Sequence, residues 1–462
     1  MKHRHFDVAV IGGGMAGLPI ANKSAYKGFK TVVIEKELLG GTCLNRGCIP
    51  TKTMIYSAKV AHTVRTAEEF GVLNSLPVVD LAKVVERKNR IVERIRKNAY
   101  KQVNKNEHLT LIEGEAVFID ENSLKVKDQV IIADKIIVNT GARPLIPKIP
   151  GLGQVPFLTN RSILDLTTLP ESLLIIGGGF IGVEFAQMFA RFGSEVTILQ
   201  KADRLVPGTD PEISEVLHKV FEKENINVIL NTDIEEAQKS VNGFTVNAAL
   251  SGRKEQYIAS QILVAAGRMP NTKYLGLDKA GVSTGENGFI KIDDGYQTSQ
   301  KNIWAIGDVT GTPMFTHSAR DDADRIYSII FKNKEVSAKD RNVPFAVFTD
   351  PEIASVGLTE GQAQSVGYEI KIGKQPFSRV ARGMATGSTE GFVKIVADNE
   401  TDKILGAQII GPHAGELIHE LVIAMDTGAK FQQISKSIHI HPTLSEAVNS
   451  AAGGVHRPAG DQ

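Results

Sequence analysis

The stretch that decides the fold is FDVAVIGGGMAGL, residues 6–18. Residues 6–11 are mostly apolar, as in a buried parallel strand, and a G-x-G-x-x-G turn follows at Gly12, Gly14 and Gly17. A second apolar run, residues 30–34, ends at Glu35. Glycines in such a turn allow a pyrophosphate to approach a helix N-terminus, and the acid binds a ribose hydroxyl. The stretch therefore predicts a dinucleotide-binding module; a glycine turn kept only for packing is the alternative.

The same pattern recurs in the middle of the chain. Residues 172–176 form an apolar run, a second turn contains Gly177, Gly179 and Gly182, and residues 196–199 are again apolar. Glu35 lies 23 positions after Gly12, and Gln200 lies 23 positions after Gly177. Two such modules imply two dinucleotides, such as a flavin and a nicotinamide that exchange a hydride.

The second module ends differently from the first. Gln200 replaces the acid, and the cations Lys201 and Arg204 follow it. A neutral residue with cations nearby suits a ribose 2′-phosphate, whereas an acid suits a free 2′-hydroxyl. The sequence therefore favours NADPH over NADH, unless the two cations are ordinary surface charges.

The only two cysteines, Cys43 and Cys48, lie in the stretch GGTCLNRGCIPTK, residues 40–52. A disulfide needs Cα atoms within about 4.4–6.8 Å, but five residues of regular helix rise roughly 7.5 Å. A bridge therefore needs a tightened turn, and Gly40, Gly41 and Gly47 allow one. Two buried small hydrophobic residues are the alternative on cysteine count alone.

Composition limits the class of protein and its partners. The chain has 462 residues, of which 23% are charged and 42% hydrophobic, and its formal net charge is +1. The length predicts about three domains, and the charge gives no case for nucleic acid or an anionic membrane as a partner. Because the first strand begins close to Met1 and no apolar run approaches the span of a bilayer, we expect a cytoplasmic protein. In that compartment a lone cysteine pair is more often redox-active or metal-binding than structural, and without nearby histidines we predict no metal site.

The remaining segments complete an ordered series of motifs. Residues 53–106 predict long helices, and residues 108–138 predict short strands that lead into a turn at Thr140 and Gly141. A similar turn contains Gly267, and the strand 302–306 is followed by Gly307 and Asp308. From about residue 341 the pattern is α+β, with strands at 343–348, 354–357, 391–396 and 405–410 and a helix at 415–425.

Together, the two glycine turns, the C-x4-C stretch, Thr140-Gly141-Ala142, Ala266-Gly267-Arg268 and Gly307-Asp308 resemble the pyridine nucleotide-disulfide oxidoreductases, a family that includes dihydrolipoamide dehydrogenase, glutathione reductase and mercuric reductase. The resemblance runs in order over essentially the whole chain. It implies an α/β fold with two Rossmann-like domains and a C-terminal α+β dimerisation domain. The implied boundaries are residues 1–150, completed by 275–340, for the FAD-binding domain, 151–274 for the NAD(P)-binding domain and 341–462 for the dimerisation domain.

The resemblance also implies how the cofactors FAD and NAD(P)H are bound. Glu35 is expected at the adenosine ribose, Asp308 at the flavin ribityl chain, and Lys52, paired with Glu184, near flavin N5, where a cation stabilises negative charge. The residues expected to bind the cofactors are Gly12, Gly14, Gly17, Glu35, Thr42, Lys52, Thr140, Gly141, Gly307 and Asp308 in the first module, and Gly177, Gly179, Gly182, Gln200, Lys201 and Gly267 in the second.

For catalysis, the resemblance implies that Cys48 exchanges electrons with the flavin and that Cys43 exchanges with the substrate sulfur. A thiol enzyme needs a base, and histidine titrates in the useful range. His441 is implied as that base and Glu446 as its carboxylate partner, both reaching the cysteines of a second subunit, so a homodimer is expected. His439 is expected to be structural.

The substrate is left open between several classes. The segment HPTLSE, residues 441–446, looks like dihydrolipoamide dehydrogenase, whereas residues 44–52 look closer to mercuric reductase. The C-terminal vicinal cysteines and the N-terminal Cys-x-x-Cys of mercuric reductases are missing, which counts against a metal-ion substrate; a glutathione reductase is a further alternative. We predict a small-molecule or lipoyl-type disulfide or dithiol as substrate. The rival classes are a flavin oxidase or transhydrogenase that does not use the cysteines, and a non-catalytic flavin-binding scaffold.

Overall fold

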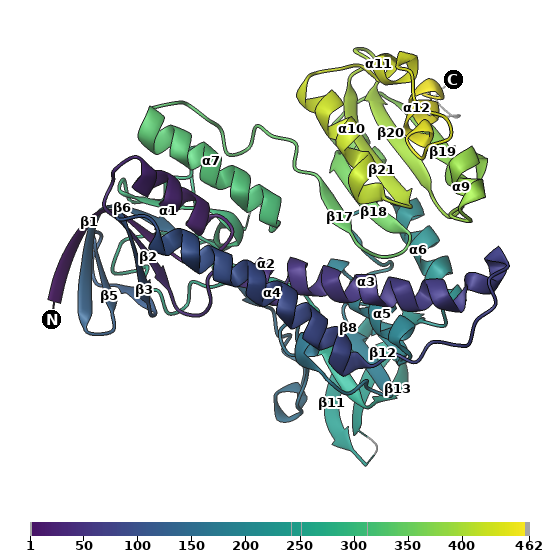
Figure 1. The fold of residues 1–462 in the computed structure, drawn as a ribbon, viewed down its shortest axis with the longest axis horizontal. Coiled ribbons are helices and arrows are strands. Elements are labelled where there is room, and N and C mark those ends of the chain that lie inside the picture. The colour runs from purple at the N-terminus through teal and green to yellow at the C-terminus, as the bar shows by residue number, and fades with distance from the viewer. Residues whose placement is uncertain (1, 242, 251, 312, 458–462) are drawn as a thin grey trace.

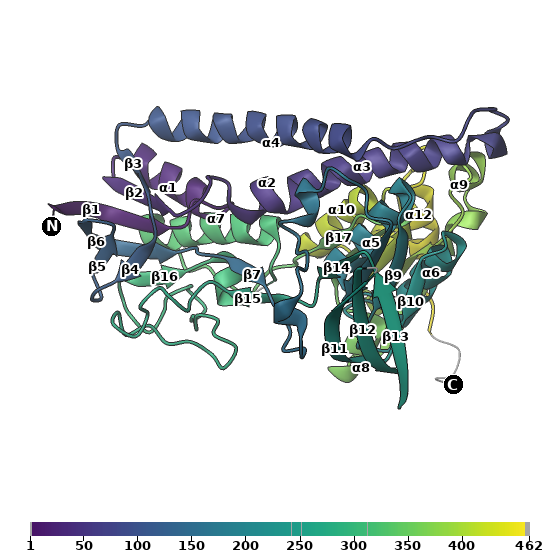
Figure 2. The same cartoon turned by 90° about the horizontal axis from the view of Figure 1, so that it is seen from below.

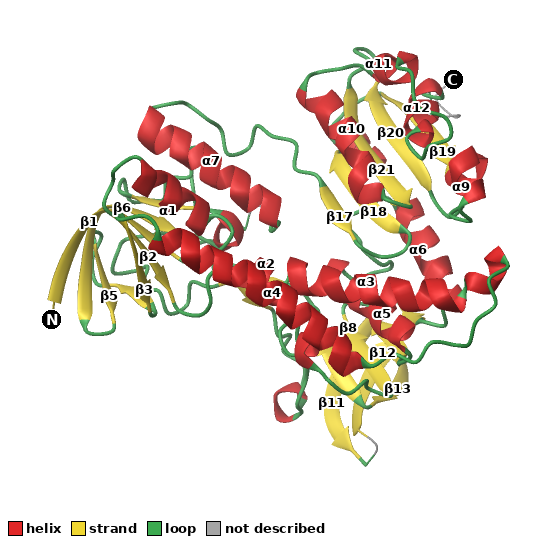
Figure 3. Cartoon of the chain, in the orientation of Figure 1, coloured by secondary structure: helices red, strands yellow, loops and turns green. Residues whose placement is uncertain are grey.

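The computed structural model describes residues 2–241, 243–250, 252–311 and 313–457 (Figure 1). Within these residues the strands form sheets of seven, four, three, two and five strands. Figure 3 shows that helices accompany the larger sheets, so the predicted α/β class is confirmed.

The first sheet is built around β1 (Lys2–Ile11), whose residues Val8, Ala9 and Val10 are fully buried. Its parallel strands follow the order β3 (Leu109–Glu113), β2 (Thr31–Glu35), β1, β6 (Gln129–Val138) and β16 (Ile303–Ala305). The antiparallel strands β5 (Ser123–Val126) and β4 (Ala116–Phe118) extend it beyond β6. Helices α1 (Gly17–Tyr26) and α7 (Thr316–Lys332) pack side by side against it (Figure 1). Residues 8–11 of β1 and 32–34 of β2 are apolar because this part of the parallel sheet is buried on both faces.

Two long helices form a rod along one side of the molecule (Figure 2). The short helix α2 (Gly41–Arg46) leads into α3 (Cys48–Arg65), and α4 (Leu81–Asn104) returns beside it. Between them lie the 3-10 turn η1 (Ala67–Phe70) and a segment without regular structure over residues 71–80. The prediction of helix throughout 53–106 is therefore wrong for this segment, where Gly71 and Pro77 interrupt the helical pattern.

The second module repeats the first. Its parallel sheet has the order β10 (Asn227–Ile229), β9 (Glu195–Leu199), β8 (Ser172–Ile176) and β14 (Gln261–Val264), which matches β3, β2, β1 and β6. Helices α5 (Phe180–Phe192) and α6 (Pro211–Lys223) belong to it. An antiparallel sheet of β11 (Thr232–Ser240), β12 (Gly243–Leu250) and β13 (Arg253–Ala259) projects from it.

Short elements join the two modules. Strands β7 (Ala142–Pro144) and β15 (Arg268–Pro270) pair in antiparallel register, and the 3-10 turns η2 (Leu152–Gln154), η3 (Ile163–Asp165) and η4 (Gly307–Thr310) lie in the connections. The predicted turns at Gly141 and Gly267 therefore lie at either end of the same small ladder.

The C-terminal region has the predicted α+β pattern. Its antiparallel sheet has the order β17 (Phe345–Val347), β18 (Glu352–Gly357), β21 (Ile404–Gly411), β20 (Phe392–Asp398) and β19 (Ile370–Pro376). The helical elements are α8 (Glu360–Ser365), η5 (Phe377–Arg379), α9 (Ala381–Ala385), α10 (Ala414–Asp426), α11 (Phe431–Lys436) and α12 (Glu446–Gly453). Strand β19 was not predicted. Its Gly373 resembles a turn residue in the sequence, but a Cβ there would overlap the Ala451 carbonyl of α12, so the glycine permits close helix packing.

Candidate functional site

The two glycine turns have the same tight packing. A Cβ on Gly17 would overlap the carbonyl oxygen of Gly12, and a Cβ on Gly182 would overlap that of Gly177. Gly12 and Gly177 also have positive φ, +103° and +109°, which favours glycine. Each turn therefore lets its helix, α1 or α5, start directly against the preceding strand.

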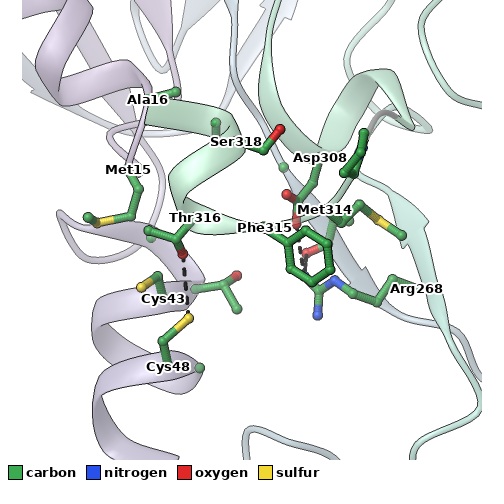
Figure 4. Close-up of a pocket in the computed structure, with 18 of the residues that line it drawn as sticks. Met15, Ala16, Cys43, Cys48, Arg268, Asp308, Met314, Phe315, Thr316 and Ser318 are labelled. Carbon is green, nitrogen blue, oxygen red and sulfur yellow. Dashed lines mark hydrogen bonds and ion pairs between the residues drawn. The ribbon is translucent and has the colours of Figure 1, made fainter. Parts of the chain in front are cut away.

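A single cavity of about 2220 Å³ runs past both turns. Figure 4 shows the part of it near Met15, Cys48 and Asp308. Drug-sized ligands occupy about 300–1000 Å³, so this cavity has room for more than one large ligand. Its lining contains most of the predicted site residues: Gly12, Gly14, Glu35, Thr42, Cys43, Cys48, Lys52, Thr140, Gly141, Gly177, Gly179, Glu184, Gln200, Gly267 and Asp308. The cavity therefore brings together parts of all three predicted regions, because α10 residues such as His419 line it too.

Polar groups in the part of the cavity around the first turn suit FAD. The Gly13 N–H donates to Glu35 Oε2 over 2.7 Å. The hydroxyl oxygens of Thr140 and Ser318 are buried and have no hydrogen-bond partner among the residues that the structure describes, although both residues line the cavity. Buried polar groups are normally paired, so these two hydroxyls fit a polar ligand.

Asp308 lies at the start of η4, with its side chain at the cavity (Figure 4). Burial raises the pKa of Asp308, against the lowering effect of Arg268, whose Nη2 lies 3.6 Å from Asp308 Oδ2. The preceding Gly307 has a φ of +70°, and its N–H donates to the buried Asp322 carboxylate over 2.9 Å. The hydrogen bond from Gly307 to Asp322 thus fixes the turn that places Asp308 at the cavity.

At the second turn the side chain of Gln200 takes the place of Glu35. The Gly178 N–H donates to Gln200 Oε1 over 2.9 Å, and Gln200 Nε2 donates to the Arg204 carbonyl over 3.1 Å. Lys201 forms an ion pair with Asp233 over 3.1 Å, with 86% of its side chain exposed, and Arg204 pairs with Asp203 over 2.9 Å. Both cations that suggested a 2′-phosphate are therefore already paired with carboxylates.

The cysteines lie on either side of a backbone break. Helix α2 ends before Gly47, which has φ −140° and ψ −119°, and α3 begins at Cys48. Both cysteines are unbridged; Cys43 is half-buried, and Cys48 is exposed to the cavity. The break at Gly47 is the irregular turn that the spacing of the two cysteines requires.

The two thiols have opposite acidities. A hydrogen bond from Cys43 lowers the pKa of Cys48 to about 6, against the effect of burial, with further lowering by Thr316 and by the charge of Lys52. The same hydrogen bond and burial raise the pKa of Cys43. Thr316 Oγ1 lies 3.4 Å from Cys48 Sγ (Figure 4). Of the two thiols, Cys48 is therefore the one whose ionised form the site favours.

Lys52 and Glu184 form the predicted pair. Lys52 Nζ lies 2.8 Å from each carboxylate oxygen of Glu184, which is itself buried. Lys52 is on α3, one turn after Cys48, and Glu184 is on α5 of the second module. The pair therefore links the cysteine helix to the second glycine turn.

His441 and Glu446 lie elsewhere in the chain. His441 Nδ1 is 2.9 Å from Glu446 Oε1, and 70% of the His441 side chain is exposed. Hydrogen bonds from His441 and from the Thr443 N–H lower the pKa of Glu446. His439 is anchored to the body of this region, because its Nε2 lies 2.7 Å from Glu420 on α10. The structure therefore pairs His441 with Glu446 and presents the imidazole outward rather than toward the cysteines of its own chain.

Three residues at the site were not predicted. Thr316 contacts Cys48, Phe348 contacts both Lys52 and Glu184, and Asn139 Nδ2 donates to the Gly12 carbonyl over 3.2 Å. Asn139 follows β6 directly, so the rule that polar residues after parallel strands meet at one sheet edge could have found it. Nothing in the local sequence marks Thr316 or Phe348.

The described residues contain neither a metal-ligating cluster nor a membrane-spanning helix. Across residues 2–241, 243–250, 252–311 and 313–457, no three His, Cys, Asp or Glu side chains gather closely enough to hold a metal ion. Over the same ranges, every helix is too short or too polar to cross a bilayer.

Comparison with known proteins gives a consistent result. Residues 6–323 match the family model described as pyridine nucleotide-disulphide oxidoreductase, and residues 343–452 match the dimerisation domain of that family. A dihydrolipoyl dehydrogenase of Thermus scotoductus is 37% identical over 460 residues, covering 98% of this chain and 98% of that protein. A mercuric reductase of Lysinibacillus sphaericus is 36% identical over 450 residues, covering 97% of this chain and 82% of that protein.

A solved structure is also similar. It is the Cu(II) complex of RclA, an HOCl-induced flavoprotein disulfide reductase from Escherichia coli, with a TM-score of 0.89 and 32% identity. The match covers 97% of this chain and 99% of that one.

Proposed function

The chain belongs to the pyridine nucleotide-disulphide oxidoreductase family, and from this premise we propose that it transfers electrons between NAD(P)H, FAD, the Cys43–Cys48 pair and a disulfide or dithiol substrate. It is a flavoprotein disulfide oxidoreductase, and the family uses FAD and NAD(P)H in general. The substrate proposed here is small or lipoyl-type, as for a dihydrolipoamide dehydrogenase. The observation that carries the proposal is the position of Cys43 and Cys48, on either side of the Gly47 break, in a cavity that both glycine turns line.

The cysteines are proposed to cycle between dithiol and disulfide. In the direction of substrate reduction, Cys43 attacks one sulfur of the substrate disulfide and releases the other as a thiol. Cys48, already a thiolate, then attacks Cys43, so that the pair becomes a disulfide and the substrate leaves as two thiols with two electrons from the pair, one proton from the Cys43 thiol and a second proton from the His441 imidazolium of the other subunit. Because the pKa of Cys48 is about 6, its thiolate is present above pH 6 and is lost as the pH falls through that value.

The cofactors have residues ready to hold them. FAD, when bound, would accept a hydride from the nicotinamide and return two electrons to the cysteine disulfide. Glu35 is proposed to hold the adenosine ribose, Asp308 the ribityl chain, and Lys52 a position beside the flavin ring. The glycines of the two turns keep the backbone close enough to bind pyrophosphates, and Thr42, Thr140, Gly141, Gly307 and Gly267 line or support the same space.

A second subunit is proposed to supply the base. The dimerisation domain of the family is present at residues 343–452, which supports a homodimer. His441 of one subunit would exchange a proton with the substrate thiol at Cys43 of the other, while Glu446 holds the imidazole and stabilises its cation. Its outward position in the single chain suits this role.

Several finer points belong to the same proposal. NADPH is favoured because Gln200 is uncharged. The ion pairs of Lys201 with Asp233 and of Arg204 with Asp203 are exposed, so each cation can leave its aspartate and bind the 2′-phosphate of NADPH instead. The domain boundaries are those given above, supported by the pairing of β16 with β6. The cytoplasm is the proposed compartment, because a reducing environment suits a redox-active pair.

The decisive experiment is an anaerobic titration of the purified yellow protein with NADPH and with NADH, followed by visible absorbance. We expect reduction to stop at a two-electron state with a long-wavelength thiolate-to-flavin band, and Cys48→Ser to abolish that band and disulfide turnover. Direct bleaching of the flavin without the band would instead support an oxidase or transhydrogenase. A variant with full physiological turnover but no Cys48 would sink the disulfide mechanism.

A soft metal ion is a second candidate substrate. Relatives include mercuric reductases, and the solved relative RclA forms a Cu(II) complex. Cys48 is an exposed thiolate, which is a suitable ligand for such ions. NADPH oxidation driven by Cu(II) or Hg(II) at least as fast as by lipoamide, and lost in both Cys43→Ala and Cys48→Ala, would favour this candidate.

A further inference from the structure

The Lys52–Glu184 ion pair does not fix the lysine by itself. The lysine ammonium is a compact charge on a flexible four-carbon stem, and 32% of the Lys52 side chain is exposed. A carboxylate can hold such a group from several directions. The position of the ammonium over the cavity therefore needs a further contact.

Phe348, the residue that follows β17, contacts both members of the pair. The Lys52 Nζ lies 4.6 Å from the centroid of the Phe348 ring, within the range of a cation–π interaction. The Phe348 backbone N–H donates to Glu184 Oε1 over 2.9 Å. One residue of the C-terminal region thus holds the cation through its side chain and the anion through its backbone.

The segment that carries Phe348 is itself fixed to α5. Gln187 exchanges two hydrogen bonds with the backbone of Asp350, both 2.7 Å long. Arg191 Nη1 lies 3.0 Å from the Asp350 carboxylate. Residues 184, 187 and 191 are three and four positions apart, so they share one face of α5. Phe348 is therefore a fixed point rather than a mobile loop residue.

Cys48 and Lys52 are four residues apart on α3, so their side chains also share a helix face. The charge of Lys52 lowers the pKa of Cys48, after the larger effects of the Cys43 and Thr316 hydrogen bonds, and the charge of Glu184 opposes it. The acidity of Cys48 depends on where the ammonium lies between the thiol, the carboxylate and the ring.

We propose that Phe348 is a positioning residue of the redox site, which holds the Lys52 ammonium and the Glu184 carboxylate in the arrangement that Cys48 requires. The inference rests on the proposed function for its consequence, because only a redox-active Cys48 makes the arrangement matter. It also ties the C-terminal region to the redox pair within a single chain, independently of any contact made by His441.

The test measures the acidity of the thiol rather than turnover. The holoenzyme is reduced with dithiothreitol, the excess is removed anaerobically, and the rate of alkylation at Cys48 is followed against pH by peptide mass spectrometry. In Phe348→Leu the backbone N–H is kept but the ring is lost, so the ammonium spends less time near Cys48. We expect the pKa of Cys48 to rise by at least ~0.5, about a threefold loss of thiolate stabilisation. Phe348→Tyr, which keeps the ring, should stay within ~0.2 of the wild type.

Two controls separate positioning from a general structural effect. Phe331→Leu removes a ring that packs on Phe29, with centroids 4.8 Å apart, away from the cavity, and should leave the pKa of Cys48 unchanged. In a Lys52→Met background, Phe348→Leu should cause no further shift. An unchanged pKa in folded Phe348→Leu, an equal shift in Phe348→Tyr or Phe331→Leu, or the same shift with and without Lys52 overturns the inference. Because the cysteines are reduced chemically, these outcomes are independent of whether NAD(P)H reduces them, which is the test of the proposed function.

Discussion

The turns at Gly12–Gly17 and Gly177–Gly182 have nearly the same packing. They differ in the charge of the side chain that accepts a hydrogen bond from the turn, which is Glu35 in the first module and Gln200 in the second. A Cβ on Gly13 would lie 2.6 Å from Leu39 Cδ2, and a Cβ on Gly178 would lie 2.7 Å from Leu205 Cδ2. The two N–H groups donate to Glu35 and Gln200 over 2.7 and 2.9 Å. The amide of Gln200 thus keeps the hydrogen bond to the turn but lacks the negative charge that Glu35 carries in the first module. Packing thus builds both turns in the same way, and the turns differ in the charge of the side chain that accepts their N–H group.

The largest loss of cofactor binding is expected when a methyl group is added to a glycine in each turn. Gly17→Ala and Gly182→Ala both force a Cβ onto a carbonyl oxygen, and overpacking of this kind costs about 1–3 kcal/mol. We expect Gly17→Ala to purify without flavin, and Gly182→Ala to stay yellow but bind NADPH roughly 10–100-fold more weakly. Flavin-to-protein absorbance ratios and nucleotide titrations measure both. Gly361→Ala, whose Cβ meets open space on α8, is the control, and a full flavin content in Gly17→Ala would contradict the expectation.

Gln200→Glu makes the second turn electrostatically equal to the first. A carboxylate about 4 Å from a charged phosphate is disfavoured by roughly 4 kcal/mol at an effective dielectric of 20. We therefore expect kcat/KM to fall at least ~10-fold with NADPH and less than ~3-fold with NADH. Gln238→Glu adds the same charge to the exposed face of β11 and should change neither. An unchanged ratio between the two nucleotides would show that Gln200 does not select between them.

Glu35→Gln is the reciprocal change, and its expected effect is smaller. The side chain keeps an acceptor for the Gly13 N–H, but hydrogen bonds to a charged group contribute roughly 1 kcal/mol more than those to a neutral one. Flavin release from dilute enzyme, followed by fluorescence, should speed up about fivefold. Glu113→Gln on the neighbouring strand β3, where the side chain is exposed, serves as the matched control. Equal release rates for the two variants would argue against a special role of Glu35.

The smallest effect is expected at Lys201. Its ion pair with Asp233 is exposed, and such pairs are worth about 0–1 kcal/mol. Lys201→Ala should lower NADPH affinity by no more than ~3-fold, and less at high salt. A loss above ~10-fold would instead identify Lys201 as the main ligand of the 2′-phosphate.

Local patterns in the sequence predicted the elements that depend on neighbours in the chain. Strand, glycine turn and helix follow one another within a few residues, so both modules could be predicted from the sequence. Gly47, which loosens the backbone, and Pro50, which suits the first turn of a helix, likewise predict the break before α3. These features need only backbone sterics and apolar periodicity.

Contacts between distant segments could not be predicted in the same way. Thr316 lies 268 positions from Cys48, and Phe348 lies 164 positions from Glu184. Neither residue type is unusual at its place in the sequence, because a threonine begins many helices and a phenylalanine occurs in many strands. Their roles arise only once three regions fold around one cavity. The ion pair of Lys201 with Asp233 could not be predicted for the same reason, since the two residues lie far apart in the sequence.

The position of β16 has a consequence for synthesis on the ribosome. The edge of β6 at Ile136–Val138 is completed only by residues 303–305, so the nascent chain must carry that edge open while the whole second module is made. At about 5–20 residues per second, this interval lasts roughly 10–30 s. An unpaired strand edge is a template for wrong pairing. The second module, whose own parallel sheet needs no later strand, can close first, and the first module acquires its last strand and its Asp308 turn only after about two-thirds of the chain has been made.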